Sequence, residues 1–208
     1  MNGKVMYKLS YGLFVLTAAE GGKDNGCIIN TAVQLTTTPN RISIAVNKSN
    51  YTHDMILRTS RFSISILNQE ANFDLFKHFG FQTGKEVDKF AGYENCKRAA
   101  DGTMIVTEGT NGFISASVIS AIDVGTHTLF LADVTDGEIF NDVPSATYEY
   151  YQNHIKAKPA AAPKADTGEV IWRCTVCGYE YKGADLPADF ICPWCKHPAS
   201  DFEKAVVG

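Results

Sequence analysis

Four cysteines near the end of the chain form two closely spaced pairs. Cys174 and Cys177 lie in the stretch CTVCGYEY, and Cys192 and Cys195 lie in CPWC. Each C-x-x-C spacing lets two thiolates converge on one ion, so the two pairs supply a tetrahedral set of four sulfur ligands. Zinc and iron both accept this set. The cysteines therefore predict a metal centre, and their spacing leaves open whether it is a structural zinc ribbon or an iron site.

A second group of residues has the composition of a phosphate site. Residues 45–56, AVNKSNYTHDMI, are predicted to leave a buried strand and enter a short helix, and between the two lie Asn47, Lys48, Ser49 and Thr52. Hydroxyls, an ammonium group and free backbone N–H groups at the start of a helix favour a phosphate dianion. A solvated turn in which Thr52 only caps the helix would explain the same residues.

The known glycine-rich nucleotide motifs do not occur in this sequence. GFQTGK at 80–85 has three residues between its glycines instead of four, and no Ser or Thr follows Lys85. There is no G-x-G-x-x-G either, so neither a P-loop nor a Rossmann fold is predicted.

Composition narrows the class of protein. The 208 residues are 45% hydrophobic and 20% charged, as in a globular protein with a buried core. The net charge of −4 argues against nucleic acid or an anionic membrane as the main partner. No apolar run has the length of a membrane span, and no export signal is recognised. We therefore expect a cytoplasmic protein, in which cysteines bind metal more readily than they form disulfides.

Alternation of apolar and polar residues predicts a mainly β fold. In RFSISIL at 61–67, Phe62, Ile64 and Ile66 share one face and two serines the other. Short strands with few helices predict a closed or partly closed antiparallel barrel. The expected strands are 11–18, 27–37, 41–46, 61–67, 112–122 and 127–134, and the expected helices are 53–60 and 71–79.

The chain is predicted to divide near residue 156. Residues 156–168, KAKPAAAPKADTG, contain alanine, proline and lysine with no aromatic or branched apolar residue, which is typical of an extended linker. The prediction is thus a domain at 1–155, a linker at 156–168 and a small domain at 169–208. A domain of about 40 residues has a marginal core and is usually stabilised by a metal or by disulfides.

The small domain resembles rubredoxin. CTVCGYEY, CPWC and DFEKA at 201–205 are similar to the shorter rubredoxin form found at the end of rubrerythrins. The resemblance implies one iron per chain, bound by the four cysteines. It also implies an aromatic core made of Trp172, Tyr179, Tyr181, Phe190, Trp194 and Phe202.

The rest of the chain resembles the flavin reductase-like family, which binds FMN on a split β-barrel. The similar stretches are 6–18, 27–46, 48–67, 88–94 and 125–140.

The resemblance implies a binding role for several residues. Asn30, Thr31, Ala32 and Val33 would lie along the isoalloxazine, and Asn47, Lys48, Ser49 and Thr52 would bind the phosphate. His127 matches a histidine often found in this family and would help to position nicotinamide, although a structural histidine at a strand end is an equal alternative. The family also implies a homodimer, because it usually completes the FMN pocket at a subunit interface.

Together the two parts resemble the high-molecular-weight rubredoxins. In that family NADH or NADPH reduces FMN, FMN reduces the iron, and the iron reduces a partner, typically a flavodiiron protein that removes oxygen or nitric oxide. Two alternatives stay open. One is a flavin reductase that releases reduced FMN, with the tail as a docking or zinc-ribbon module. The other is an electron carrier without nicotinamide activity.

Overall fold

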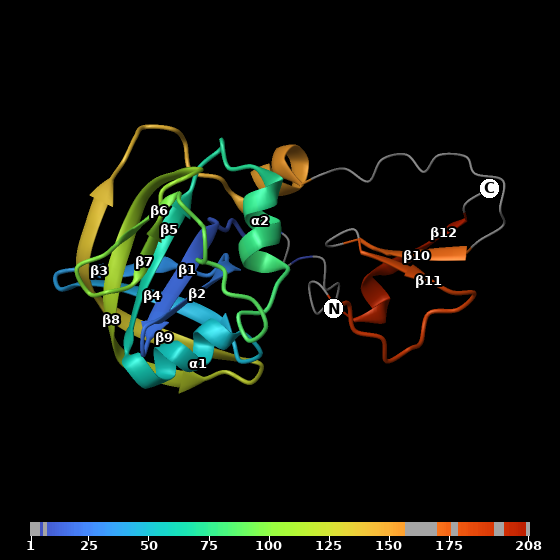
Figure 1. Ribbon diagram of the computed structural model, residues 1–208, viewed down its shortest axis with the longest axis horizontal. Helices are drawn as coiled ribbons and strands as arrows, with labels where there is room; N and C mark the ends of the chain where they lie inside the picture. The colour runs from blue at the N-terminus through green and yellow to red at the C-terminus, as the bar shows by residue number, and fades with distance from the viewer. Residues whose placement is uncertain (1–4, 6–7, 157–169, 176–178, 194–197, 207–208) are drawn as a thin grey trace. The chain divides into compact units, whose positions relative to one another are not determined.

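The computed structural model describes residue 5 and residues 8–156, 170–175, 179–193 and 198–206. It divides into two compact units, Met1–Lys156 and Ala157–Gly208, each of which is described by itself (Figure 1). Residues 157–169 lie outside the described residues, so the predicted linker at 156–168 and the domain bounds on either side stay predictions.

The larger unit is built on one antiparallel sheet of seven strands, in the order β2-β1-β5-β8-β9-β4-β3 (Figure 1). The two edge strands, β2 and β3, follow each other in the sequence, yet no ladder joins them in the described part of the chain. The barrel is therefore split between β2 and β3, and the predicted mainly β split barrel is confirmed. The strands are β1 Phe14–Glu20, β2 Lys23–Ile29, β3 Val33–Thr37, β4 Asn40–Asn47, β5 Arg61–Leu67, β8 Thr110–Asp123 and β9 His127–Ile139.

The prediction of one strand over 27–37 is wrong. The run is broken at residues 30–32, where the chain crosses the split from β2 to β3. The Thr31 hydroxyl donates to Ala45 O at 2.7 Å and accepts from Ala45 N at 3.1 Å, so a side chain takes the place of a ladder partner for β4. Because Thr31 is β-branched and apolar residues flank the Asn30-Thr31 pair on both sides, the sequence pattern looks continuous across this break.

The main core fills the barrel from the inner faces of its strands. Leu16, Ile44 and Phe130 are fully buried there. Helix α1, Tyr51–Thr59, adds Met55 and Ile56 to the same cluster. Met55 and Ile56 lie with Thr52 on the buried face of α1, and their packing holds the helix, and the turn before it, against the barrel.

The serine face of β5 is also buried, because the hairpin of β6 (Cys96–Arg98) and β7 (Met104–Val106) covers it. The Ser63 hydroxyl lies 2.6 Å from the hydroxyls of Thr103 and Ser115, and the Ser65 hydroxyl accepts from Val106 N at 2.9 Å. These bonds satisfy groups that would otherwise be costly to bury.

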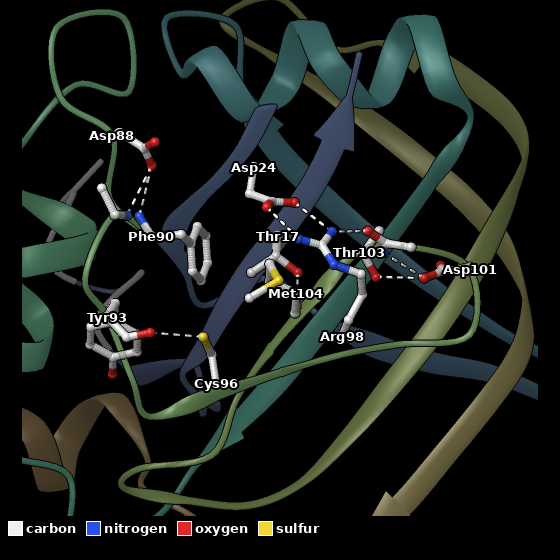
Figure 2. A network of polar contacts seen from close by, with 12 residues as sticks. Thr17, Asp24, Asp88, Phe90, Tyr93, Cys96, Arg98, Asp101, Thr103 and Met104 are labelled. Carbon is white, nitrogen blue, oxygen red and sulfur yellow. Dashed lines mark hydrogen bonds and ion pairs between the residues drawn. The ribbon is translucent and has the colours of Figure 1, made fainter. Parts of the chain in front are cut away.

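Further polar contacts fix the hairpin on the sheet (Figure 2). The Arg98 guanidinium donates twice to the carboxylate of Asp24 on β2, at 3.0 and 2.8 Å. The Thr17 hydroxyl of β1 donates to Met104 O. A bidentate Arg–carboxylate pair is one of the stronger surface interactions, so the hairpin is attached at both of its strands.

A second, aromatic-rich cluster forms around helix α2, Phe73–Gly80. Two short turns near the end of the unit, α3 Tyr148–Tyr150 and η2 Tyr151–Ile155, pack against it, with the rings of Phe76 and Tyr151 4.4 Å apart. The predicted helices at 53–60 and 71–79 are thus confirmed as α1 and α2, with ends displaced by one or two residues.

The smaller unit contains a three-stranded antiparallel sheet in the order β11-β10-β12. Phe190 lies at the centre of its aromatic cluster, 4.8 Å from the ring of Tyr181 and 5.4 Å from that of Phe202. Trp194 of the predicted aromatic core lies outside the described residues. The elements are β10 Val170–Cys174, β11 Glu180–Lys182, η3 Ala199–Asp201 and β12 Phe202–Val206.

Among the described residues of both units, none of the helices has the length and apolar character needed to cross a bilayer.

Candidate functional site

The turn between β4 and α1 leads into a helix start that no side chain caps. Asn47 holds the turn, since its carbonyl accepts from Asn50 N at 3.0 Å and its side chain accepts from Ser49 N at 2.9 Å. Asn50 is the N-cap residue of α1 but makes no side-chain cap hydrogen bond. Its amide donates to Cys27 Sγ instead, at 3.7 Å. In the first turn the His53 N–H donates to Asn50 O at 3.0 Å, and no side chain caps the N–H groups of Tyr51 and Thr52. The start of the helix therefore offers backbone donors and the positive dipole end that favour an anion such as phosphate.

Thr52 has a supporting position beneath this turn. It is the second residue of the helix, so the alternative in which Thr52 is the helix cap is wrong. Its side chain is fully buried, and its hydroxyl accepts from Asn25 Nδ2 at 2.9 Å. Thr52 thus joins the predicted phosphate loop to β2, and its proposed contact with the phosphate stays a prediction.

Lys48 is paired with the turn between β8 and β9. Its ammonium lies 2.7 Å from Asp123 Oδ1, and its backbone N–H donates to Thr126 O at 3.0 Å. Hydrogen bonds from Lys48 and from the Gly125 N–H hold the pKa of the Asp123 carboxyl below its usual range. The cation predicted to bind phosphate therefore already has a carboxylate beside it.

His127 lies at the same end of the barrel as the phosphate loop. It opens β9 directly opposite Asn47 in the β4–β9 register, and its Nδ1 lies 2.8 Å from the Thr126 hydroxyl. Asn47, Lys48, Ser49 and His127 are therefore brought together at this end of the barrel. Whether His127 contacts nicotinamide stays a prediction.

His53 was missed by the sequence analysis. It is buried, with Nδ1 2.9 Å from Asp54 Oδ1 and Nε2 2.8 Å from the hydroxyl of Thr128, next to His127 on β9. It ties the first turn of α1 to β9. Only its position, directly after Thr52 on the buried face of a predicted helix, could have indicated this role.

Ala32 and Val33 face a different part of the barrel from the phosphate loop. They line a groove of about 870 Å³ together with residues from the start of β4 and the end of β9, whereas the phosphate loop follows the end of β4. Thr31, through its bonds to Ala45, connects this segment to the end of β4. The lining also includes Phe14, Ile42, Ile64, Ile66 and Ile114.

The smaller unit brings two of the four predicted metal ligands into its core. Cys174 and Cys192 are both buried. Each opens a short loop whose ends are tied by the backbone: Cys174 N donates to Tyr179 O at 2.8 Å, and Ile191 bridges Pro198. Cys177 and Cys195 lie outside the described residues. Two buried thiols at the start of closed loops fit a closed four-sulfur site.

Two family models match the chain. The flavin reductase like domain matches residues 6–159, and the rubredoxin-like domain of rubrerythrin matches residues 172–203. The chain therefore belongs to the flavin reductase-like family and carries a rubredoxin-like domain after it. The predicted cofactors, FMN and iron, are confirmed by this pair of domains.

Within that class, the chain is similar over its whole length to the High molecular weight rubredoxin of Moorella thermoacetica. The two are 33% identical across 98% of this chain and 100% of the relative. The Ferric-chelate reductase (NAD(P)H) of Archaeoglobus fulgidus is 37% identical across 76% of this chain and 93% of its own length. These relatives support an oxidoreductase.

A solved structure shows the same barrel. An NADH:FAD oxidoreductase from Streptomyces globisporus superposes with a TM-score of 0.62, covering 69% of this chain and 84% of that protein at 20% identity. At this identity the similarity establishes the fold alone.

We expect Gly84→Ala to destabilise the larger unit by roughly 1–3 kcal/mol, as overpacking of a close contact does. A Cβ at Gly84, in the former P-loop candidate GFQTGK, would overlap Asn25 Oδ1. Asn25 is buried and bonded to Thr52, so it has little room to move. Chemical unfolding measures the loss. In an Asn25→Ala background the same change should cost much less, and an equal cost in both backgrounds would rule out this contact as the cause.

Proposed function

We propose that this protein takes a hydride from NADH or NADPH at its FMN and passes electrons singly, through an iron bound by four cysteines, to a partner such as a flavodiiron protein. The observation that carries the proposal is the presence of both domains in one chain, in the order found along the whole length of the high molecular weight rubredoxin relative. FMN accepts two electrons as a hydride and can release them one at a time, whereas a tetrahedral iron takes only one.

The residues are proposed to act as follows. The β4–α1 turn binds the phosphate through Asn47, Lys48, Ser49 and the first-turn N–H groups of α1, with Thr52 beneath them. The segment that crosses the split, Asn30, Thr31, Ala32 and Val33, lies along the ring. His127 helps to orient nicotinamide near the end of β4. The iron is bound by Cys174, Cys177, Cys192 and Cys195.

Direct oxidation of nicotinamide tests this proposal against its alternatives. The purified protein should oxidise NADH or NADPH without an added flavin, and its visible spectrum should show bound flavin together with iron–thiolate absorption. A pure electron carrier would not oxidise the nucleotide. A flavin reductase that releases its product would lose its flavin on gel filtration and require added FMN for turnover. Zinc in protein made under iron-replete conditions would contradict the redox role of the tail.

A second candidate activity, reduction of ferric chelates at the flavin, is favoured by the 37% identical relative of that name. This activity requires only the larger unit. Anaerobic reduction of ferric citrate by NADPH or NADH should then persist when the iron centre is removed, whereas delivery to a rubredoxin-linked partner should not.

The protein is expected to sediment as a homodimer. Strand β3 is an edge strand exposed along its whole length, with Val33 58% and Leu35 49% exposed beside the apolar groove. An exposed apolar edge of this kind favours contact with another copy. Analytical ultracentrifugation should give twice the mass of the chain, and Leu35→Lys should shift the species toward monomer. A wild-type monomer that retains FMN would contradict the prediction.

A further inference from the structure

Lys89 is a buried cation without a carboxylate partner. The residue is only 2% exposed, and its ammonium donates to Gly26 O and to Phe79 O, each at 2.8 Å. Both partners are neutral carbonyls, and in the described part of the chain no acidic side chain pairs with it. Burying a charge in this way is costly unless an opposite charge compensates it.

The Phe79 carbonyl lies in the last turn of α2, where the helix dipole supplies partial negative charge, but the side chains around Lys89 supply no full charge. The carboxylate of the adjacent Asp88 is turned to the backbone and accepts from Phe90 N and Ala91 N, at 3.0 and 3.2 Å (Figure 2). His78 of α2 meets Lys89 at its backbone, where His78 Nε2 lies 2.6 Å from the Lys89 carbonyl oxygen. On β2, burial raises the pKa of the Cys27 thiol, which keeps that thiol neutral.

Tyr93, from the same loop as Lys89, also supplies no negative charge to compensate the Lys89 ammonium. Its ring packs against the rings of Phe79 and His78. Burial raises the pKa of its hydroxyl, so the phenol stays neutral.

The ammonium is connected to the phosphate loop through β2. It is bonded to the carbonyl of Gly26, and the residues on either side of Gly26 both touch the loop. Asn25 donates to the Thr52 hydroxyl, and Cys27 accepts from the Asn50 amide. The buried side chains of Asn25, Cys27 and Thr52 lie along this connection, and in such a low-dielectric environment a charge is weakly screened.

The loop has few other cations to balance a phosphate dianion. Lys48 is neutralised by Asp123 at 2.7 Å. Lys23 is exposed and lies over the ring of Tyr51, 4.6 Å from its centre, where solvent screens it.

We propose that Lys89 is a cationic residue of the phosphate site, which balances charge on the FMN phosphate from behind β2. This proposal rests on the FMN site proposed above.

The charge of Lys89 should make FMN binding depend on pH. Burial lowers the pKa of the Lys89 ammonium to about 8. A phosphate monoester is largely dianionic above pH 7, so its charge is nearly constant from there on. FMN binding favours the protonated lysine and must raise this pKa. The extra affinity is therefore complete below pH 8 and is lost as the pH rises through 8 and above.

Riboflavin distinguishes an electrostatic effect of Lys89 on the phosphate from a structural effect on the flavin site, because it carries the same ring and ribityl chain without the phosphate. We expect the preference of the apoprotein for FMN over riboflavin, the ratio of the two dissociation constants, to fall roughly tenfold between pH 7 and pH 9.5. In Lys89→Gln, whose amide still donates to carbonyls, the preference should already be lower at pH 7 and stay flat over this range. Flavin fluorescence titration measures both constants.

Matched variants make the outcome decisive. Lys77→Gln, which removes an exposed lysine paired with Asp74 on α2, should leave both the ratio and its pH dependence unchanged. Equal losses of FMN and riboflavin affinity in Lys89→Gln would show a structural role only and overturn the proposal. So would a wild-type ratio that is flat from pH 7 to 9.5, a measurement that needs no variant.

A wrong FMN site and a wrong role of Lys89 give different results in the Ser49→Asp variant. If Ser49→Asp binds FMN as the wild-type protein does, the phosphate lies elsewhere and the FMN site itself is wrong. The other outcome is that Ser49→Asp loses FMN while the ratio of the two dissociation constants changes neither in Lys89→Gln nor with pH. In that case the FMN site is right and only the role of Lys89 is refuted.

Discussion

Ser49→Asp is expected to bind FMN at least about a hundredfold more weakly than the wild-type protein. Ser49 is exposed in the turn before α1, between Lys48 and the N-cap residue Asn50. A carboxylate there would face the phosphate dianion over a short distance, where like charges cost on the order of 3–4 kcal/mol near a protein surface. Titration of the apoprotein with FMN, followed by flavin fluorescence, measures the loss.

Ser49→Asn is the matched control for this variant. Asparagine has the shape of aspartate without its charge and is common in turns, so it should keep FMN within about tenfold of wild type. The iron spectrum of both variants should be unchanged, since the cysteines lie in the other unit. Wild-type FMN affinity in Ser49→Asp would count directly against phosphate binding at the β4–α1 turn.

Cys192→Ser is expected to abolish the iron centre and to leave flavin reduction by nicotinamide intact. The Cys192 thiol is fully buried at the start of the second cysteine loop. Exchange of a soft thiolate for a hydroxyl weakens a four-sulfur site, and in so small a domain the loss of metal is coupled to unfolding. The rate of electron delivery to a one-electron protein acceptor should fall by at least roughly a hundredfold, because no other centre in the proposed chain carries single electrons outward.

Cys96→Ser is the matched control, because it removes a cysteine thiol outside the predicted metal site. Cys96 belongs to the hairpin of the larger unit, where its Sγ donates to Tyr93 O at 3.0 Å, and it is no part of the predicted metal set (Figure 2). This variant should keep its iron and its electron delivery. A Cys192→Ser protein that still reduced the one-electron acceptor at the wild-type rate would show that electrons leave from the flavin and bypass the iron.

Features set by local spacing could be predicted from the sequence. The two C-x-x-C pairs predict a metal centre from their spacing alone, and the match to the rubredoxin-like domain supports that prediction. The turn 47–50 is visible as a polar cluster between a strand and a helix. The alternation in 61–67 likewise indicates a strand, because the side-chain period of a strand is fixed at two residues.

Features set by contacts between distant segments could not be predicted. Nothing near Ser63 and Ser65 shows that a hairpin some forty residues later covers them. The break at 30–32 depends on the bond of Thr31 to Ala45, which only the folded sheet provides. In the sequence Lys89 looks like an ordinary surface lysine, and only the folded structure shows that α2 and β2 enclose it.

The order of electron flow is tested most directly by anaerobic stopped-flow mixing of the full-length protein with NADH or NADPH. Absorbance is followed at a flavin wavelength and at an iron–thiolate wavelength. We predict that flavin absorbance falls first, that iron absorbance follows with a lag, and that protein stripped of FMN shows no iron reduction on the same timescale. Iron reduced as fast in the flavin-free protein as in the holoprotein would contradict the conversion of a hydride into single electrons by this chain.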